Sequence, residues 1–299
     1  MSASGRKPLI LFFLAVFPGA MVLGPLLYFA CAGHLAFHRA MDRALLICAV
    51  ASLVLFRSNI SLRKLWPFDS AGGMQFLWGW AAALVSAQAI IGAHLVFVNL
   101  ASSHLPAGAV AARFLEALAA ALIVPLLEET LFRGFFQTEM IARFGSRWGW
   151  LLTAFIFALA HFLKTPATFD HQPVHLWSGI SALVAAFEAI RDQFFPATGT
   201  DFFSLTKGFN IFLLGLILGA TFLRCGTLWF NAGLHGGLVF VLLLSTGLTH
   251  PVKPPPLAWV PGDIVSSPLT SVVLILLSLW LWLFYQPHFA KSGNGENAP

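Results

Sequence analysis

The sequence predicts an all-α membrane protein, and three observations support this fold class. The chain of 299 residues is 58% hydrophobic and only 10% charged, whereas about a quarter of the residues of a soluble domain are charged. Apolar runs of roughly 20 residues, the length that crosses a bilayer as a helix, recur along the chain. The alternating segments of about ten residues that are typical of a membrane barrel do not occur in the sequence. Helices are therefore the expected spanning elements.

Nine apolar stretches are candidate spans, which predicts a polytopic bundle of about eight or nine transmembrane helices. They are residues 8–32, 40–56, 74–99, 114–141, 148–163, 174–195, 208–224, 227–247 and 268–286. The stretch 174–195 fits least well, because charged side chains crowd its end. The first stretch exceeds the roughly 7–15 apolar residues of a signal peptide, so we expect it to be retained as a span.

We expect residues 1–299 to form a single integral membrane domain of a cell or inner membrane, followed after residue 286 by a disordered tail, 287–299. Positive side chains are more frequent in the connections on the N-terminal side, which predicts a cytoplasmic N-terminus. The net charge of +5 comes from singly placed Lys and Arg. No basic run is present, so membrane lipid is an expected partner and nucleic acid is not.

The run "LIVPLLEETLFRGFF" at 122–136 places three ionisable side chains inside a span. Each costs about 2.5–3.5 kcal/mol at the centre of a bilayer, so their presence requires an explanation. Glu129 and Arg133 are four residues apart in the favourable order and are expected to form an ion pair. Glu128 lies about 100° around the same helix. It therefore needs partners from other helices.

Two other spans supply polar side chains one helical turn apart. Phe157 and His161 lie in "FIFALAHF", and Asn231 and His235 lie in "LWFNAGLHGG". At 1.5 Å per residue, Glu128, His161 and His235 lie about 18–22 Å from the expected inner ends of their spans. These matching depths predict that one carboxylate and two imidazoles meet within the membrane.

A carboxylate and two imidazoles can hydrolyse a peptide bond. The carboxylate takes a proton from water, and the imidazoles bind that water or stabilise the oxyanion that its attack forms. A metal variant stays open, in which Glu128, His161 and His235 hold a divalent ion such as zinc. No H-E-x-x-H pair is present. We therefore favour chemistry without a cofactor.

The three motifs, in this order on separate spans, resemble the CPBP family of intramembrane proteases. This family includes the Ras-converting CAAX endopeptidase and bacterial bacteriocin-processing and immunity proteins. The resemblance covers residues 112–245, which are the expected protease-like core. It implies a helical intramembrane endopeptidase of the glutamate type that acts on a membrane-tethered peptide or protein. The identity of the substrate, and whether it is prenylated or cut near its C-terminus, stay open.

The resemblance also implies roles for individual residues. Glu128 is the glutamate that activates water, and Glu129 and Arg133 are its supporting pair. His161 and His235 are the two histidines that bind water or stabilise the oxyanion.

The remaining motif positions are less regular. Phe157 is the aromatic residue of the second motif and is a candidate for substrate binding. Family members commonly have Asn four positions after the last histidine, where this chain has Val239. Asn231 lies four positions before His235 on the same helix face, so it is a further catalytic candidate, with hydrogen bonding between helices as its simpler role.

Two other classes of function stay open. Intramembrane Glu, Arg and His also mark the pathways of ion-coupled transporters, although the internal repeats common in such carriers are not visible. A non-enzymatic scaffold or immunity-like relative of the protease fold is the second alternative, and Val239 favours it. Outside the motifs, His94 is expected to be structural and His38, near a connection, to be solvated.

Overall fold

The computed structural model describes residues 7–31, 34–55, 61–97, 100–171, 173–195, 202–251 and 263–284. These residues are mainly helical, and a short antiparallel sheet joins β1 (Leu100–Ser102) to β2 (Thr249–Pro251). The predicted all-α fold of a polytopic membrane protein is confirmed. The predicted disordered tail at 287–299 lies outside the described residues.

Within the described residues, each predicted span overlaps a helix. The helices are α1 (Lys7–Ala30), α2 (Phe37–Leu55), α3 (Leu62–Leu65), α4 (Ser70–Phe97), α5 (Ala107–Glu129), the π-helix η3 (Thr130–Gln137), α6 (Thr138–Ala160), α7 (Ser178–Phe194), α8 (Phe202–Cys225), α9 (Trp229–Leu248) and α10 (Pro268–Phe284). Among the described residues, five stretches are long and apolar enough to cross a membrane: Leu9–Ala30, Ser70–Leu95, Ala107–Ala160, Phe202–Cys225 and Trp229–Leu248. Whether α2, α7 and α10 also cross the membrane stays a prediction.

The stretch Ala107–Ala160 has 54 residues, which as one helix would be roughly 80 Å long against a hydrocarbon core of about 30 Å. Gly145 interrupts it with φ 78° and ψ 166°, a conformation that favours glycine. A Cβ on Gly149 would collide with the backbone of Met140 and Ile141. This close approach means that the chain turns back at Gly145. The turn agrees with the prediction of two separate spans, at 114–141 and 148–163.

The chain divides into two compact units: unit 1 comprises Met1–Ser61 and Ile156–Phe202, and unit 2 comprises Leu62–Phe155 and Phe203–Pro299. In unit 1, α1 packs against α2 and α7. Phe37, Met41 and Ala182 form its small buried core.

The 3-10 helix η4 (Ala167–His171) of unit 1 is fastened to the start of α2. Asp170 accepts hydrogen bonds from the backbone N–H of His38 at 3.1 Å and from its ring Nδ1 at 2.6 Å. The backbone N–H of Thr165 donates to Asp42 Oδ1 at 3.0 Å. The carboxylate of Asp170 thus satisfies a donor at the N-terminus of a helix. His38, which was expected to be solvated, stays partly exposed at 23% and also pairs with this loop.

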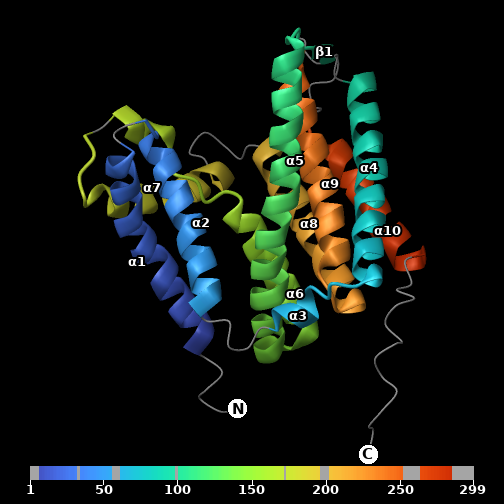
Figure 1. The fold of residues 1–299 in the computed structure, drawn as a ribbon, viewed down its shortest axis with the longest axis horizontal. Helices are drawn as coiled ribbons and strands as arrows, with labels where there is room; N and C mark the ends of the chain where they lie inside the picture. The colour runs from blue at the N-terminus through green and yellow to red at the C-terminus, as the bar shows by residue number, and fades with distance from the viewer. Residues whose placement is uncertain are drawn as a thin grey trace, which may run out of the picture. The chain divides into compact units, whose positions relative to one another are not determined.

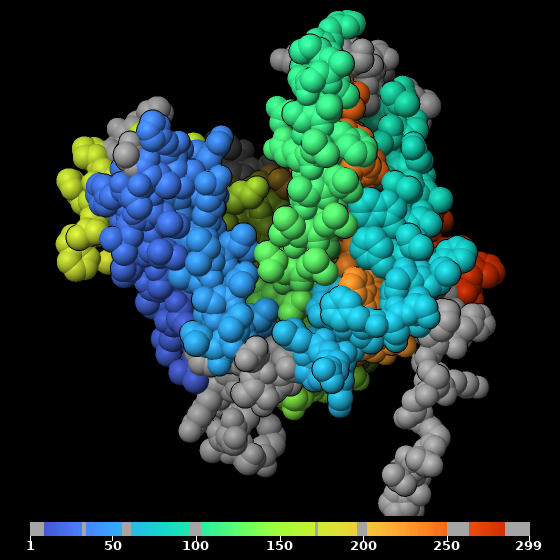
Figure 2. Space-filling view, viewed as in Figure 1, coloured from blue at the N-terminus to red at the C-terminus, as the bar shows by residue number. Residues whose placement is uncertain are grey.

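In unit 2, α9 packs directly against α4 and α5 (Figure 1). Figure 2 shows α9, in orange, in the gap between the green α5 and the cyan α4. The contact with α4 is backbone to backbone: a Cβ on Gly79 would collide with the carbonyl of Phe230, and one on Gly233 with the carbonyl of Phe76. Small residues permit such close approach between membrane helices.

The contact between α5 and α9 depends on a proline. Pro125 lies inside α5 and has no N–H for the carbonyl four residues before it, that of Ala121. A Cβ on Gly236 would collide with this same carbonyl oxygen. The backbone of α9 therefore lies against the carbonyl that Pro125 frees, which brings the neighbouring His235 close to the end of α5.

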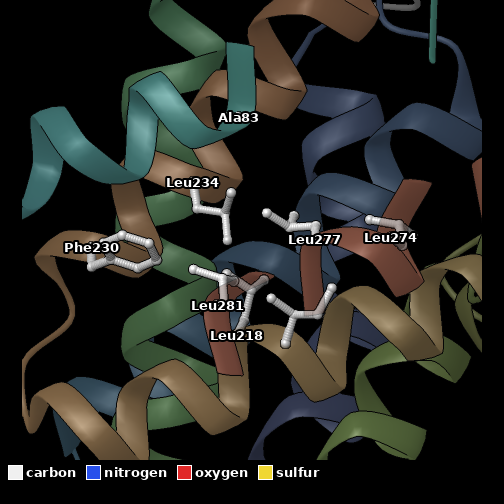
Figure 3. Packing of buried hydrophobic residues seen from close by; sticks show 8 residues of the cluster. Ala83, Leu218, Phe230, Leu234, Leu274, Leu277 and Leu281 are labelled. Carbon is white, nitrogen blue, oxygen red and sulfur yellow. The ribbon is translucent and has the colours of Figure 1, made fainter. Parts of the chain in front are cut away.

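A leucine-rich core holds α8, α9 and α10 together. Leu218 of α8, Phe230 and Leu234 of α9, and Leu277 and Leu281 of α10 belong to one buried cluster. Their side chains point toward one another in Figure 3. This packing fixes α8 beside the α9 turn that carries the polar residues of the third motif.

Candidate active site

Glu129, the last residue of α5, is fully buried and has three polar partners. Its Oε1 accepts from Arg133 Nη1 at 3.1 Å and contacts His235 Nδ1 at 2.9 Å. Its Oε2 accepts from Asn231 Nδ2 at 3.1 Å. The predicted ion pair with Arg133 is therefore present. Because an ionised carboxylate only accepts hydrogen bonds, Nδ1 of His235 carries a proton and donates it to Glu129.

The π-helix η3 directs polar side chains toward α8. Arg133 Nη2 donates to the carbonyl of Gly215 at 3.3 Å, and Gln137 Nε2 donates to that of Gly219 at 3.0 Å. Sequence reasoning missed Gln137, although it follows Arg133 by four residues just as Arg133 follows Glu129. This repeat of four was the signal that would have identified it.

Asn231 connects Glu129 to α8. Besides Glu129, its Nδ2 donates to the carbonyl of Leu218 at 2.6 Å, and its Oδ1 accepts from the hydroxyl of Thr221 at 2.8 Å. Both amide protons and the carbonyl oxygen of Asn231 are thus engaged. Thr221 carried no motif, and sequence reasoning missed it as well.

Four carbonyls of α8 accept hydrogen bonds from side chains of other helices. They are those of Gly215, Leu216, Leu218 and Gly219, and their donors are Arg133, Trp150, Asn231 and Gln137. A carbonyl has a second lone pair that remains available when it already accepts a helical N–H. The α8 backbone therefore provides acceptors for polar side chains that would otherwise be unsatisfied in an apolar core.

Glu128 has different surroundings from its neighbour Glu129. Its side chain is 25% exposed, and its Oε2 lies 3.8 Å from Nε2 of His235. This distance is longer than a hydrogen bond, as is common for catalytic groups without substrate. The His235 ring is thus held through Nδ1 by Glu129 and directs Nε2 toward Glu128.

The second motif lies in unit 1. Phe157 is fully buried, and its ring centroid lies 4.5 Å from that of His161. His161 Nδ1 lies 2.8 Å from the carbonyl oxygen of Phe157. The placement of both residues relative to Glu128, which belongs to unit 2, stays a prediction.

The predicted metal ligands are Glu128, His161 and His235, and the neighbouring Glu129 Oε1 is engaged by Arg133 and His235. Within the ranges that the structure describes, no group of three or more His, Cys, Asp or Glu side chains is arranged to hold a metal ion. Glu128 and Nε2 of His235 are the predicted ligands from unit 2. A metal would also need His161, so the metal variant stays a prediction.

Residues 108–241 match the model of a family described as type II CAAX prenyl endopeptidase Rce1-like. This segment is Rce1-like. The Rce1-like segment nearly coincides with the expected protease core at 112–245 and contains the whole network from Glu128 to His235. The resemblance to CAAX proteases, which was inferred from the motifs, is confirmed. None of the curated proteins matches the chain. The match supports an integral membrane protein with the general activity of an intramembrane protease.

Proposed function

We propose that the protein is an intramembrane endopeptidase in which Glu128 activates water against a peptide bond of a membrane-tethered substrate. The observation that carries the proposal is the line of three groups in the Rce1-like segment. Glu128 is partly exposed, His235 directs Nε2 toward it, and the buried Glu129 holds His235 from the other side.

The reaction needs one proton carrier and one stabilised charge. Glu128 takes a proton from water as the water oxygen attacks the peptide carbonyl carbon, and then transfers this proton to the leaving nitrogen when the C–N bond breaks. His235 Nε2 binds the water or, when protonated, donates to the oxyanion. Glu129 orients the ring and stabilises its charged form, and Arg133 balances the charge of Glu129.

The other motif residues have supporting roles in this proposal. His161 is the second imidazole, and Phe157 orients it through their ring contact. Asn231 holds Glu129 and is not a donor to the oxyanion, because both of its amide protons already have acceptors. No step requires a metal ion.

The family description, which names prenyl endopeptidases, supports a prenylated peptide cut near its C-terminus as the substrate. A prenyl chain partitions into lipid and would hold such a peptide at the membrane. The N-terminus is proposed to be cytoplasmic, because Lys and Arg side chains are more frequent in the connections on its side of the membrane.

The test is cleavage of a prenylated C-terminal peptide by the full-length protein in liposomes. Glu128→Gln keeps the shape of the side chain but removes the base, and the expected loss in kcat is about 10²–10⁴-fold. Glu116→Gln is the matched control: it lies on the same helix, in an exposed pair with Arg113, and should leave the rate unchanged. Full cleavage by Glu128→Gln contradicts the proposal. Ion flux that depends on Glu128 without any cleavage would support a transporter.

A further inference from the structure

The amide of Asn231 can have only one orientation in this network. Its Nδ2 faces two acceptors, Glu129 Oε2 and the carbonyl oxygen of Leu218. Turning the amide by 180° would direct Oδ1 at both of these oxygens, which is repulsive because no proton would lie between them. Oδ1 therefore faces Thr221.

The hydroxyl of Thr221 has one proton and three acceptors within reach. They are the carbonyl oxygens of Ile217 and Leu218 at 3.0 Å each and Asn231 Oδ1 at 2.8 Å. The two carbonyls already receive other hydrogen bonds, from the α8 backbone and, at Leu218, from Asn231. Asn231 Oδ1 is buried and needs a donor, and Thr221 supplies one. The hydroxyl of Thr221 therefore donates its proton to Asn231 Oδ1, which is the shortest of the three contacts.

We propose that Thr221 is a positioning residue of the protease reaction: its hydroxyl fixes the Asn231 amide that holds Glu129, and through Glu129 it fixes the His235 ring that faces Glu128. The inference rests on the proposed function. Without the hydroxyl, Asn231 Oδ1 is buried with no donor. The amide then leaves its place, Glu129 Oε2 loses a partner, and the imidazole loses its fixed direction. Thr221 itself is buried and acts through Asn231.

The test compares two buried threonines of unit 2. Thr221→Val removes the hydroxyl that donates to Asn231, whereas Thr153→Val removes one that donates only to the carbonyl of Gly149, at 2.8 Å in its own helix. Both side chains are buried, so the two substitutions alter packing alike. Thr221→Val is expected to lower kcat by about 10-fold with KM changed less than about 2-fold, because the loss concerns the alignment of the reacting groups. Thr153→Val should retain kcat, and Thr221→Ser should restore it.

A double-mutant cycle separates positioning from general destabilisation. In Asn231→Ala the acceptor of the Thr221 hydroxyl is gone, so adding Thr221→Val should change kcat by less than about 2-fold. If Thr221→Val does not accumulate in membranes, Thr221→Ala takes its place with the same expected results. The Asn231→Ala background also corrects for any loss of folding that does not pass through this hydrogen bond.

The inference is overturned if Thr221→Val and Thr153→Val have the same kcat, if Thr221→Ser stays as slow as Thr221→Val, or if the two substitutions add fully in the cycle. Glu128→Gln is measured alongside. Inactivity of Glu128→Gln together with any of these results rejects Thr221 alone, whereas full activity of Glu128→Gln rejects the proposed function itself.

Discussion

Unit 1 and unit 2 each contain a close carboxylate–imidazole pair, and the two pairs have different surroundings. Asp170 and His38 lie 2.6 Å apart, and their side chains are 24% and 23% exposed. Glu129 and His235 lie 2.9 Å apart, and their side chains are 0% and 4% exposed. The contacts are chemically similar, but the side chains of the first pair are about a quarter exposed and those of the second are buried.

This difference determines what each pair can do. Asp170 also accepts from a backbone N–H at the start of α2, so its pair closes a loop onto a helix. Glu129 is instead surrounded by Arg133, Asn231 and His235, because a buried charge without such partners would cost several kcal/mol. The buried pair therefore fixes the direction of the His235 ring, with Nε2 directed toward Glu128. The exposed pair stabilises local structure.

Replacing one histidine from each pair should have the largest effect. His235→Ala removes the imidazole that faces Glu128, and kcat should fall by about 10²–10⁴-fold. His38→Ala should leave kcat within about 2-fold and should increase amide hydrogen exchange at residues 165–170, which the pair fastens to α2. Peptide cleavage in liposomes and hydrogen exchange of the same samples measure both effects. Equal loss of cleavage in the two variants would contradict the distinction between the pairs.

The cost of a buried unpaired charge can be measured at Arg133. Arg133→Met leaves Glu129 without its cation and should lower the free energy of unfolding by about 3–5 kcal/mol. Arg113→Met is the control: it breaks an exposed pair with Glu116, which is worth about 1 kcal/mol or less. Thermal unfolding in detergent compares the two. A similar small shift in Tm for both variants would show that the Glu129 network does not need Arg133.

The smallest effect is expected at Asp170 and depends on pH. Burial raises the pKa of Asp170, but hydrogen bonds from the backbone and ring of His38 outweigh it and hold the pKa below its usual value. The stabilisation is therefore fully present above the unfolded pKa of about 3.9 and is lost as the pH falls through the lower folded pKa. Wild type should be more stable than Asp170→Asn at pH 6, and the difference should shrink below about pH 4. A difference in Tm that does not change with pH would contradict this assignment.

Much of the fold follows from local sequence. Helix positions depend on apolar run length, and the Glu129–Arg133 pair depends on a spacing of four within one helix, so both were predictable. The two spans on either side of Gly145 could also be predicted, because a short polar connection separates their apolar stretches in the sequence. By contrast, the interruption by a π-helix and the contact of Gly236 with the Ala121 carbonyl depend on how α5, α8 and α9 pack.

The partners of Glu129 could not be predicted from the sequence. Both histidines were expected to face Glu128, whereas His235 contacts Glu129 through Nδ1 and directs only Nε2 toward Glu128. Thr221 and Gln137 resemble many other polar residues of apolar helices until a neighbouring helix supplies their partners. Their roles could not be predicted, because no spacing along one helix reports which carbonyls the next helix presents.

The sequence by itself determined that this chain is a helical membrane protein with a protease-like polar core, because the length of apolar runs and the high cost of charges in lipid act locally. Only the tertiary structure decided which of two adjacent glutamates is enclosed and which stays accessible. Neighbouring residues of a helix differ in direction by about 100°, so α9 covers Glu129 and leaves Glu128 partly exposed.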